Sequence, residues 1–448
     1  MDMLSLLRAG KLSGCKRLDL SCGLEQFPEE IYDLADTLEI LNLSGNALSS
    51  LPNALARLHK LKVIFCSGNQ FTHVPEVLGE CPQLEMIGFK DNRIGHLPAS
   101  SLPKQLRWLI LTDNQLGELP SELGQCTRLQ KLMLAGNRLK YLPDELAGLQ
   151  RLELLRISAN CFDGLPEWVY FLPRLAWLAF SGNPFSDVAE FAAMKKQSLV
   201  DIDWCRIEMQ RKLGEGASGV IHQAVWQNSS DKAIPVAVKL FKGSVTSDGL
   251  PRSEKAACIA AGEHPNLVAV AGKISGHPDN TPGLVLSLID SSFRNLANPP
   301  SLDSCTRDVY PDKARSSIGV TLSLAQGVAA AATHLHERGI MHGDLYAHNI
   351  LCNEQGECLL GDFGAASFID RKDGRQLLAL QRIEVRAFGC LLEELLERCV
   401  VAPDAASVLE RLRVLQQRCD QLDVSERPLF SEIMHDLAEI NILHFATR

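Results

Sequence analysis

Leucine recurs at a nearly constant spacing through the first part of the chain. One set of equivalent leucines is separated by 23, 23, 22, 23, 23 and 23 residues: Leu38, Leu61, Leu84, Leu106, Leu129, Leu152 and Leu175. Each unit reads L-x-x-L-x-L-x-x-N-x-L-x-x-L-P-x-x-L-x-x-L with substitutions, and a degenerate copy starts near Cys15. This periodicity predicts an array of stacked repeats over residues 15–198, preceded by an N-terminal cap over 1–14.

The repeated unit resembles leucine-rich repeats, with about eight copies in this chain. The resemblance implies a solenoid whose leucines share one core and whose asparagines form a ladder that bonds backbone groups. The asparagines concerned are Asn46, Asn69, Asn92, Asn114, Asn137, Asn160 and Asn183. A proline in each unit ends the strand and opens the convex side, because proline lacks an N–H and fixes φ.

Several strand positions that do not point into the repeat core are apolar. Side chains alternate faces along a strand, so these positions belong to the concave face of the arch. The residues are Phe65, Trp108, Ile110, Met133 and Trp177. Exposed strand positions are ordinarily polar, so this stripe predicts a protein-binding surface, for a partner or for another part of the chain. The alternative is that the curvature of the arch or a folded-back second domain covers them.

A glycine-rich segment follows the repeats. It contains Leu213, Gly214, Gly216, Gly219 and Ile221, and the spacing G-x-G-x-x-G is weak evidence when it stands alone. Here an apolar strand over residues 235–239 follows and ends in lysine. Glycines let backbone N–H groups approach phosphates without a Cβ in the way, and an ammonium on the next strand can pair with those phosphates. The combination predicts a phosphate-binding loop over residues 213–221.

Two further motifs follow later in the chain. Residues 342–349 match H-x-D-x-x-x-x-N, and residues 362–364 read D-F-G. With the glycine loop and Lys239, they make residues 199–448 resemble the protein kinases. The resemblance implies ATP and Mg²⁺ as cofactors, Asp344 as the carboxylate that accepts the proton of the attacking hydroxyl, and Asn349 and Asp362 as metal ligands.

The same resemblance assigns the nucleotide pocket. Lys239 is implied as the residue that binds the α and β phosphates, and Glu254 as its partner on a following helix. Ala237, Leu286 and Leu351 are implied as further cofactor-binding residues, with Leu286 near the adenine pocket on the strand that leads into the hinge.

The chain departs from the kinase pattern in three places. Gly343 stands where many kinases have arginine before the catalytic aspartate, and Tyr346 stands where Ser/Thr kinases have lysine. The A-P-E element is missing, since only a short segment separates D-F-G from Glu384, which resembles the start of the buried C-lobe helix. We therefore expect slow catalysis, a shortened peptide-docking platform, and an unknown partner for Arg427.

Composition and charge exclude several other functions. The formal charge is 45 − 54 = −9, which disfavours nucleic-acid binding. The 14 cysteines include no C-x-x-C pair, so neither a zinc site nor a redox dithiol is indicated, and a cytoplasmic location is expected. We expect no stretch of about 20 uncharged apolar residues, and the junction over 198–213 is too short and charged to cross a membrane.

The sequence predicts an α/β leucine-rich repeat solenoid followed by an α+β two-lobed, protein-kinase-like domain. The architecture is similar to that of soluble, bacterial-type repeat kinases. The expected function is an intracellular ATP-dependent protein kinase of the Ser/Thr type, with the arch selecting substrate or regulator. The alternatives are a kinase-fold phosphotransferase for a small molecule and a nucleotide-binding pseudokinase scaffold.

Overall fold

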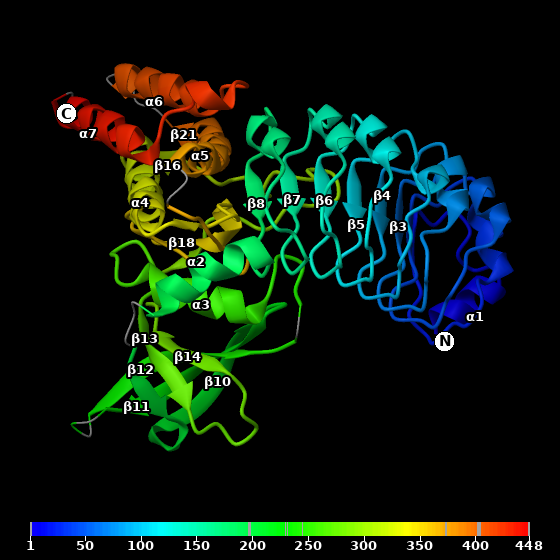
Figure 1. Ribbon diagram of the computed structural model, residues 1–448, viewed down its shortest axis with the longest axis horizontal. Coiled ribbons are helices and arrows are strands. Elements are labelled where there is room, and N and C mark those ends of the chain that lie inside the picture. The colour runs from blue at the N-terminus through cyan, green and yellow to red at the C-terminus, as the bar shows by residue number, and fades with distance from the viewer. Residues whose placement is uncertain are drawn as a thin grey trace. The chain divides into compact units, whose positions relative to one another are not determined.

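A computed structural model describes residues 2–195, 199–228, 230, 232–243, 245–371, 374–400 and 405–446 (Figure 1). The chain divides into two compact units, Met1–Arg174 and Leu175–Arg448. The expected boundary at residue 198 lies outside the described residues. The last repeat of the sequence pattern, from Leu175 onward, falls in the second unit.

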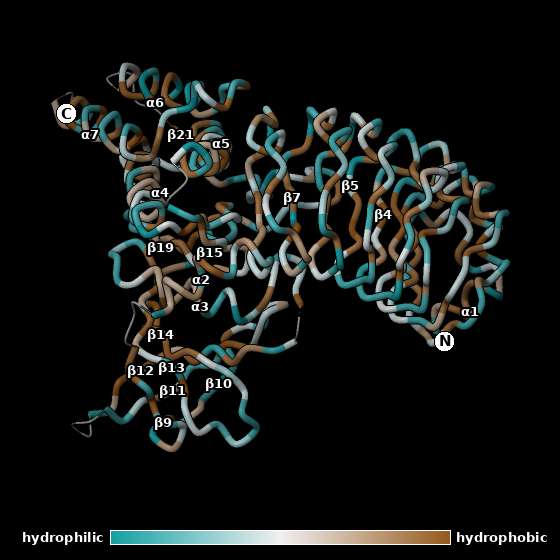
Figure 2. Tube along the Cα trace, viewed as in Figure 1, coloured by the Kyte–Doolittle hydropathy of each residue, from teal (hydrophilic) through white to brown (hydrophobic). Residues whose placement is uncertain are grey.

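The first unit is a parallel arch of short strands, each followed by a 3₁₀-helix. Helix α1 (Met3–Arg8) precedes β1 (Arg17–Asp19), β2 (Ile40–Asn42), β3 (Val63–Phe65), β4 (Met86–Gly88), β5 (Trp108–Ile110), β6 (Lys131–Met133) and β7 (Leu154–Arg156). The 3₁₀-helices are η1 (Glu29–Leu34), η2 (Asn53–Arg57), η3 (Glu76–Glu80), η4 (Ala99–Ser101), η5 (Ser121–Gln125), η6 (Asp144–Gly148) and η7 (Glu167–Phe171). Hydrophobic residues, brown in Figure 2, follow the strands β4 and β5, and the central strand residues Leu41, Leu109 and Leu132 are fully buried.

The asparagine ladder is confirmed. Asn69 accepts a hydrogen bond from the Leu48 amide at 2.9 Å and donates to the Leu43 carbonyl at 2.9 Å, so one side chain joins two repeats. Asn137 makes the equivalent bonds to Leu116 and Leu111. The 3₁₀-helices each follow a proline in extended conformation, as with Pro52 before η2 and Pro120 before η5. These residues therefore have structural roles.

The concave-face prediction holds only in part. Phe65, Trp108 and Ile110 are half-buried, whereas Met133 is 9% exposed and Trp177 only 1%. The Met133 sulfur accepts a hydrogen bond from the Trp108 indole at 3.4 Å. Met133 does not belong to an open surface, because it packs against Trp108 in the arch. Trp177 contacts another part of the chain, one of the two kinds of partner predicted for the stripe, since it packs on Leu345 and Tyr346 within the second unit.

The second unit contains a small lobe built on a mixed sheet. Its strand order is β10-β11-β12-β14-β13-β9. The strands are β9 (Asp201–Asp203), β10 (Ile207–Glu215), β11 (Gly219–Gln227), β12 (Ala233–Phe241), β13 (Val270–Ser275) and β14 (Gly283–Ser287). Helix α3 (Pro251–Ala261) packs beside this sheet, and Ile259 of α3 joins Phe241 and Leu284 in one apolar cluster. The elements of the last repeat, β8 (Trp177–Ala179) and α2 (Pro184–Lys195), precede this lobe, and η8 (Trp204–Arg206) links β9 to β10.

The larger lobe is mainly helical. Its helices are α4 (Ile318–Glu337), α5 (Gly374–Glu397), α6 (Ala406–Cys419) and α7 (Phe430–Ala446), with the 3₁₀-helices η9 (Ala347–Asn349) and η11 (Val424–Glu426). Short strands frame the loops between them: β15 (Arg294–Asn295), β16 (Ser316–Ser317), β17 (Ile340–Met341), β18 (Ile350–Cys352), β19 (Cys358–Leu360), β20 (Ser367–Phe368) and β21 (Cys399–Val400). The buried C-lobe helix, whose start Glu384 resembles, lies within α5.

Helix α4 is long and apolar enough to cross a membrane by length and composition. The expectation that no such stretch exists was therefore wrong. More than half of its apolar window, 56%, is buried inside the protein, and the helix packs against α5 and α7. A core helix of this length also meets the length and composition criteria for a membrane span, because it is apolar over most of its circumference. The same property lets it pack inside a protein.

Candidate active site

The glycine loop connects β10 and β11, which pair as an antiparallel hairpin. The Gly216 amide donates to the Gly219 carbonyl at 2.9 Å and closes the turn. A Cβ at Gly219 would lie 2.4 Å from the Leu240 carbonyl oxygen of β12, whereas Gly214 and Gly216 face open space. One glycine is thus required for packing, and the other two leave the backbone of the turn accessible, as a phosphate-binding loop requires.

Strand β12 carries two of the expected site residues, Ala237 and Lys239. Ala237 and Lys239 stand two residues apart, so their side chains share one face of the sheet. Lys239 pairs in register with Ile221 of β11, and Ala237 pairs with Leu286 of β14. Ala237 is buried and Ile221, Leu286 and Leu351 are half-buried, while Leu213 is exposed. The strand register therefore places Ile221 opposite Lys239 and Leu286 opposite Ala237, so these expected cofactor-binding residues lie on neighbouring strands of one sheet.

Lys239 forms an ion pair with Glu254 of helix α3. Burial opposes the charge on the lysine, but the carboxylates of Glu254 and Asp362 outweigh it and raise the lysine pKa. The ammonium is therefore charged at neutral pH. Both side chains are largely buried, and a buried pair of this kind fixes the position of the helix relative to the strand. The expected contact between strand lysine and helix glutamate is present.

The catalytic loop is held by bonds within the loop itself. The Asn349 amide group donates to the Asp344 carboxylate at 2.7 Å and to the Asp344 carbonyl at 2.9 Å. His342 has its Nε2 2.8 Å from the Gly361 carbonyl oxygen, and its Nδ1 accepts from the Asp344 amide at 3.3 Å. The loop is thereby tied to the residue that precedes Asp362, and the side-chain oxygen of Asn349 is left available.

Asp362 adopts a left-handed backbone conformation with φ of 52°. Aspartate tolerates this region better than most residues, and such strain is common at functional sites. Its Oδ1 accepts from the Gly364 amide at 3.1 Å. Its charge raises the pKa of Lys239 and also of His348, so Asp362 lies within electrostatic range of both groups. It connects the lysine side of the site with the catalytic loop.

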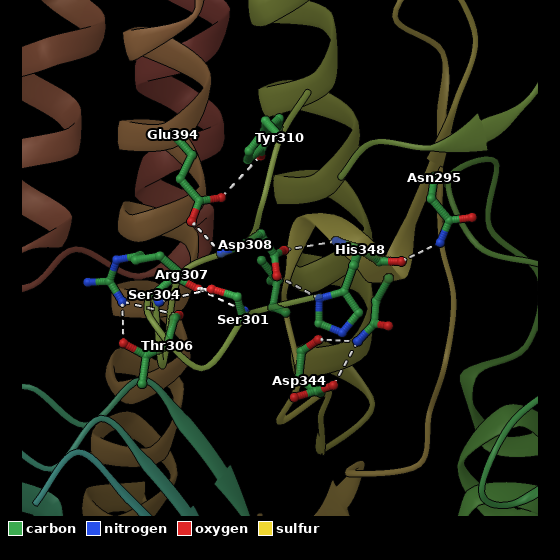
Figure 3. A network of polar contacts seen from close by, with 12 residues as sticks. Asn295, Ser301, Ser304, Thr306, Arg307, Asp308, Tyr310, Asp344, His348 and Glu394 are labelled. Atoms are coloured by element: carbon green, nitrogen blue, oxygen red, sulfur yellow. Dashed lines mark hydrogen bonds and ion pairs between the residues drawn. The ribbon is translucent and has the colours of Figure 1, made fainter. Parts of the chain in front are cut away.

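A further histidine stands in the catalytic loop, and sequence reasoning missed it. His348 Nδ1 lies 2.7 Å from Asp308, and Asp308 also accepts from the His348 amide at 2.9 Å (Figure 3). Burial alone lowers the histidine pKa, but Asp308 followed by Asp344 and Asp362 raises it overall. These carboxylates favour the imidazolium form next to Asp344. No sequence signal marks Asp308, because it lies 40 residues before His348.

Glu384 of helix α5 holds the catalytic loop through a hydrogen bond. Its carboxylate is fully buried, lies 2.7 Å from His336 Nε2, and accepts from the Gly343 amide at 2.6 Å. Burial would raise the pKa of Glu384, but the histidine and the amide lower it overall, so the residue is ionised. The sequence marked Glu384 only as the start of a helix motif, and the bond to the loop supplies its role.

Arg427, whose partner was unknown, is buried and donates to backbone carbonyls. Its Nε donates to the Gln421 carbonyl at 2.8 Å and one terminal nitrogen donates to the Arg382 carbonyl at 3.1 Å. Burial and the neighbouring Arg386 lower the pKa of Arg427 to about 10. The arginine therefore ties α5 to the segment that follows α6, a structural role.

The donor set suits a magnesium–nucleotide substrate. A carboxylate on Asp362 and a free amide oxygen on Asn349 are hard oxygen ligands of the kind that Mg²⁺ prefers. Among the described residues no group of three or more His, Cys, Asp or Glu side chains could hold a metal by itself. A cation here would thus rely on phosphate oxygens for further ligands, which is usual for magnesium in phosphotransferases.

Comparison with known proteins agrees with this geometry. Residues 207–387 match the family described as protein tyrosine and serine/threonine kinase. Leucine-rich repeat families match residues 37–58, 105–126 and 127–185. The chain thus consists of leucine-rich repeats followed by a protein kinase domain.

Individual relatives are distant and cover only part of the chain. A probable serine/threonine-protein kinase of Dictyostelium discoideum is 29% identical over 184 residues, or 40% of this chain and 10% of that protein. A serine/threonine-protein kinase of Arabidopsis thaliana is 26% identical over 218 residues, or 44% of this chain and 24% of that protein. The tyrosine-protein kinase transforming protein Abl of Abelson murine leukemia virus is 26% identical over 264 residues, or 51% of this chain and 33% of that protein. The chain matches at most about a third of the length of these relatives.

Proposed function

We propose that this protein is an active, cytoplasmic, Mg²⁺- and ATP-dependent protein kinase of the serine/threonine type. The observation that carries the proposal is the arrangement around one site of the Lys239–Glu254 ion pair, Asp362 and the Asp344–Asn349 pair. All four charged groups that phosphoryl transfer needs are retained, and a scaffold without turnover gains nothing evident from keeping them.

The chain's own residues have distinct tasks in this proposal. The backbone of the turn between Gly214 and Gly219 and the Lys239 ammonium bind the phosphates. Asp344 orients the attacking hydroxyl and accepts its proton. Asp362 and Asn349 hold the metal, which neutralises charge that develops on the phosphate oxygens. Because lysine is absent at position 346, one cationic contact to the transferred group is missing, and we expect slow turnover.

The serine/threonine assignment and the acceptor class need a direct test. Purified full-length protein is incubated with γ-labelled ATP and generic protein substrates, and labelled products are hydrolysed to phosphoamino acids. We expect phosphoserine or phosphothreonine, and phosphotyrosine alone would contradict the assignment. Asp362→Asn should abolish transfer yet keep the fold, since asparagine also tolerates positive φ and retains an acceptor for the Gly364 amide.

A small-molecule phosphotransferase is the second candidate, and one observation favours it. Helix α5 begins at Gly374, soon after Gly364, so the described residues between them leave little chain for a peptide-docking platform. If label from ATP enters small hydroxyl compounds but neither protein substrates nor the protein itself, this second function replaces the first.

A further inference from the structure

The last leucine-rich repeat contacts the catalytic loop inside the second compact unit. Trp177 of β8 is 1% exposed, and its indole ring stacks on Tyr346 with ring centroids 4.1 Å apart and planes inclined by 6°. The indole N–H donates to the Leu345 carbonyl at 3.2 Å. Leu345 directly follows Asp344, so one tryptophan of the repeat holds both the backbone and a side chain of the catalytic loop.

Gly343 has the same neighbour. Its φ is +75°, and a Cβ there would lie 2.6 Å from the Leu178 carbonyl of β8 and 2.6 Å from the Ala365 carbonyl. An arginine, which many kinases have at this position, does not fit. Both departures from the kinase pattern in this loop, Gly343 and Tyr346, thus lie where the last repeat packs.

The segment after D-F-G is anchored by the same repeat. Ser367 of β20 is fully buried, its hydroxyl accepts from the Phe180 amide at 2.9 Å, and it donates to the Ala365 carbonyl at 3.3 Å. β20 also pairs with β17, which leads into the catalytic loop. The hydrogen bonds of the Ser367 hydroxyl and the pairing of β17 with β20 therefore order a segment that other kinases order with a phosphate.

Helix α2 extends the contact to the small lobe. Glu190 of α2 accepts a hydrogen bond from Ser253 of α3 at 3.0 Å, and both side chains are buried. Ser253 precedes Glu254, the partner of Lys239. Asp187 of α2 also forms an ion pair with Arg252 of α3, with 3.5 Å between the carboxylate oxygen and the guanidinium nitrogen. The repeat therefore contacts the two elements whose relative position decides whether the phosphate site is assembled.

We propose that the last repeat is a built-in replacement for the activation segment and that Trp177 is its main positioning residue. Resting on the proposed kinase function, the inference adds that Trp177, Leu178 and Phe180 hold the catalytic loop and β20 in working geometry without phosphorylation. Displacement of a catalytic group by about 1 Å can lower a rate roughly 100-fold, so a residue in this position affects turnover without touching substrate.

The test compares full-length wild type with Trp177→Ala and Trp177→Phe. We expect Trp177→Ala to lower kcat at least ~10-fold with KM for ATP changed less than ~2-fold, because the nucleotide contacts lie elsewhere. Trp177→Phe keeps a ring on Tyr346 but loses the donor to Leu345, so its kcat should fall between the two. Phe89→Ala, which removes a buried aromatic of the first unit, is the matched control and should leave kcat unchanged.

Amide hydrogen exchange over residues 342–349 provides a readout that needs no activity. We expect faster exchange in Trp177→Ala than in wild type and no change in Phe89→Ala. If wild type transfers phosphate but Trp177→Ala has unchanged kcat and exchange, the inference is overturned. A rise of kcat in Trp177→Ala overturns it too, since the repeat would then be inhibitory. A wild type without transfer contradicts the proposed function, and unchanged exchange in Trp177→Ala would contradict the positioning role separately.

Discussion

Glu394 is a buried carboxylic acid in helix α5 whose surroundings disfavour its charge. Its carboxylate accepts hydrogen bonds from the Tyr310 hydroxyl at 3.1 Å and from the Asp308 backbone amide at 3.4 Å (Figure 3). Burial, followed by the charge of Asp308, raises its pKa to about 7. The residue therefore titrates close to neutral pH, next to the aspartate that holds His348.

This shift predicts a pH-dependent stability. The folded pKa of Glu394, about 7, exceeds its ordinary value of 4.5, so the folded state holds the proton more tightly. Its contribution to the free energy of unfolding is complete below pH 4.5 and is lost as the pH rises through 7. Glu394→Gln does not titrate, so at pH 8 it should be more stable than wild type by roughly 1–3 kcal/mol and at pH 4.5 by much less. Urea unfolding at both pH values measures this, and equal differences at both would contradict the assignment.

At the scale of elements, neighbouring strands of the arch contain both fully buried and partly exposed apolar side chains. Leu132 in β6 is fully buried and Ile110 in β5 is half-buried. Leu132→Ala should lower the free energy of unfolding of the repeat unit by ~2–5 kcal/mol through the cavity it leaves. Ile110→Ala should cost only about 1 kcal/mol, because part of its surface is already in water. Equal losses in denaturant titrations would show that the concave face is core.

Strand β20 gives a second prediction at this scale. Ser367 is the only hydroxyl-bearing residue between Asp362 and Ile383, but it is fully buried and bonded to the Phe180 amide. A kinase cannot reach it, so phosphorylation of this segment should not switch the enzyme on. Ser367→Ala leaves a buried N–H without its acceptor and should destabilise the protein by about 1–3 kcal/mol.

Ser367→Asp separates the two explanations. A phosphorylation switch predicts that the aspartate restores activity lost in Ser367→Ala, whereas a structural serine predicts that it does not. Ser367→Thr, which keeps the hydroxyl, should retain more activity than either. Transfer rates of the four proteins after incubation with ATP decide the matter, and recovery in Ser367→Asp alone would refute the structural role.

Sequence periodicity and motif order predicted most elements of the fold but not the contacts between them. The 23-residue spacing predicted the arch and its asparagine ladder, and motif order predicted the kinase lobes with Lys239, Asp344, Asn349 and Asp362. The sequence placed Trp177 in the same stripe as Trp108, because the two residues occupy the same position in their repeats, but it did not identify the contact of Trp177. Only tertiary structure shows that its partner Leu345 lies 168 residues later. Asp308 was missed for the same reason, since a lone aspartate in a loop carries no periodic signal.

For the whole molecule, the second compact unit explains the unusual catalytic loop. Gly343 and Tyr346 look like defects in the kinase pattern when the sequence is read alone. In the structure they are the residues on which the last repeat packs, so the repeat array and the kinase domain share an element within one unit. Under the proposed function, control by a phosphorylated loop is unnecessary, and we propose regulation through the repeats instead.

The most direct test of this account is phosphate transfer by the dephosphorylated full-length protein. The wild-type protein is treated with phosphatase, the phosphatase is removed, and the initial rate of label transfer from γ-labelled ATP is compared with that of untreated protein and of Asp344→Ala. We expect equal rates before and after treatment and loss of at least ~99% of the rate in Asp344→Ala. Loss of transfer after dephosphorylation, or a rate in Asp344→Ala equal to that of wild type, would contradict this account.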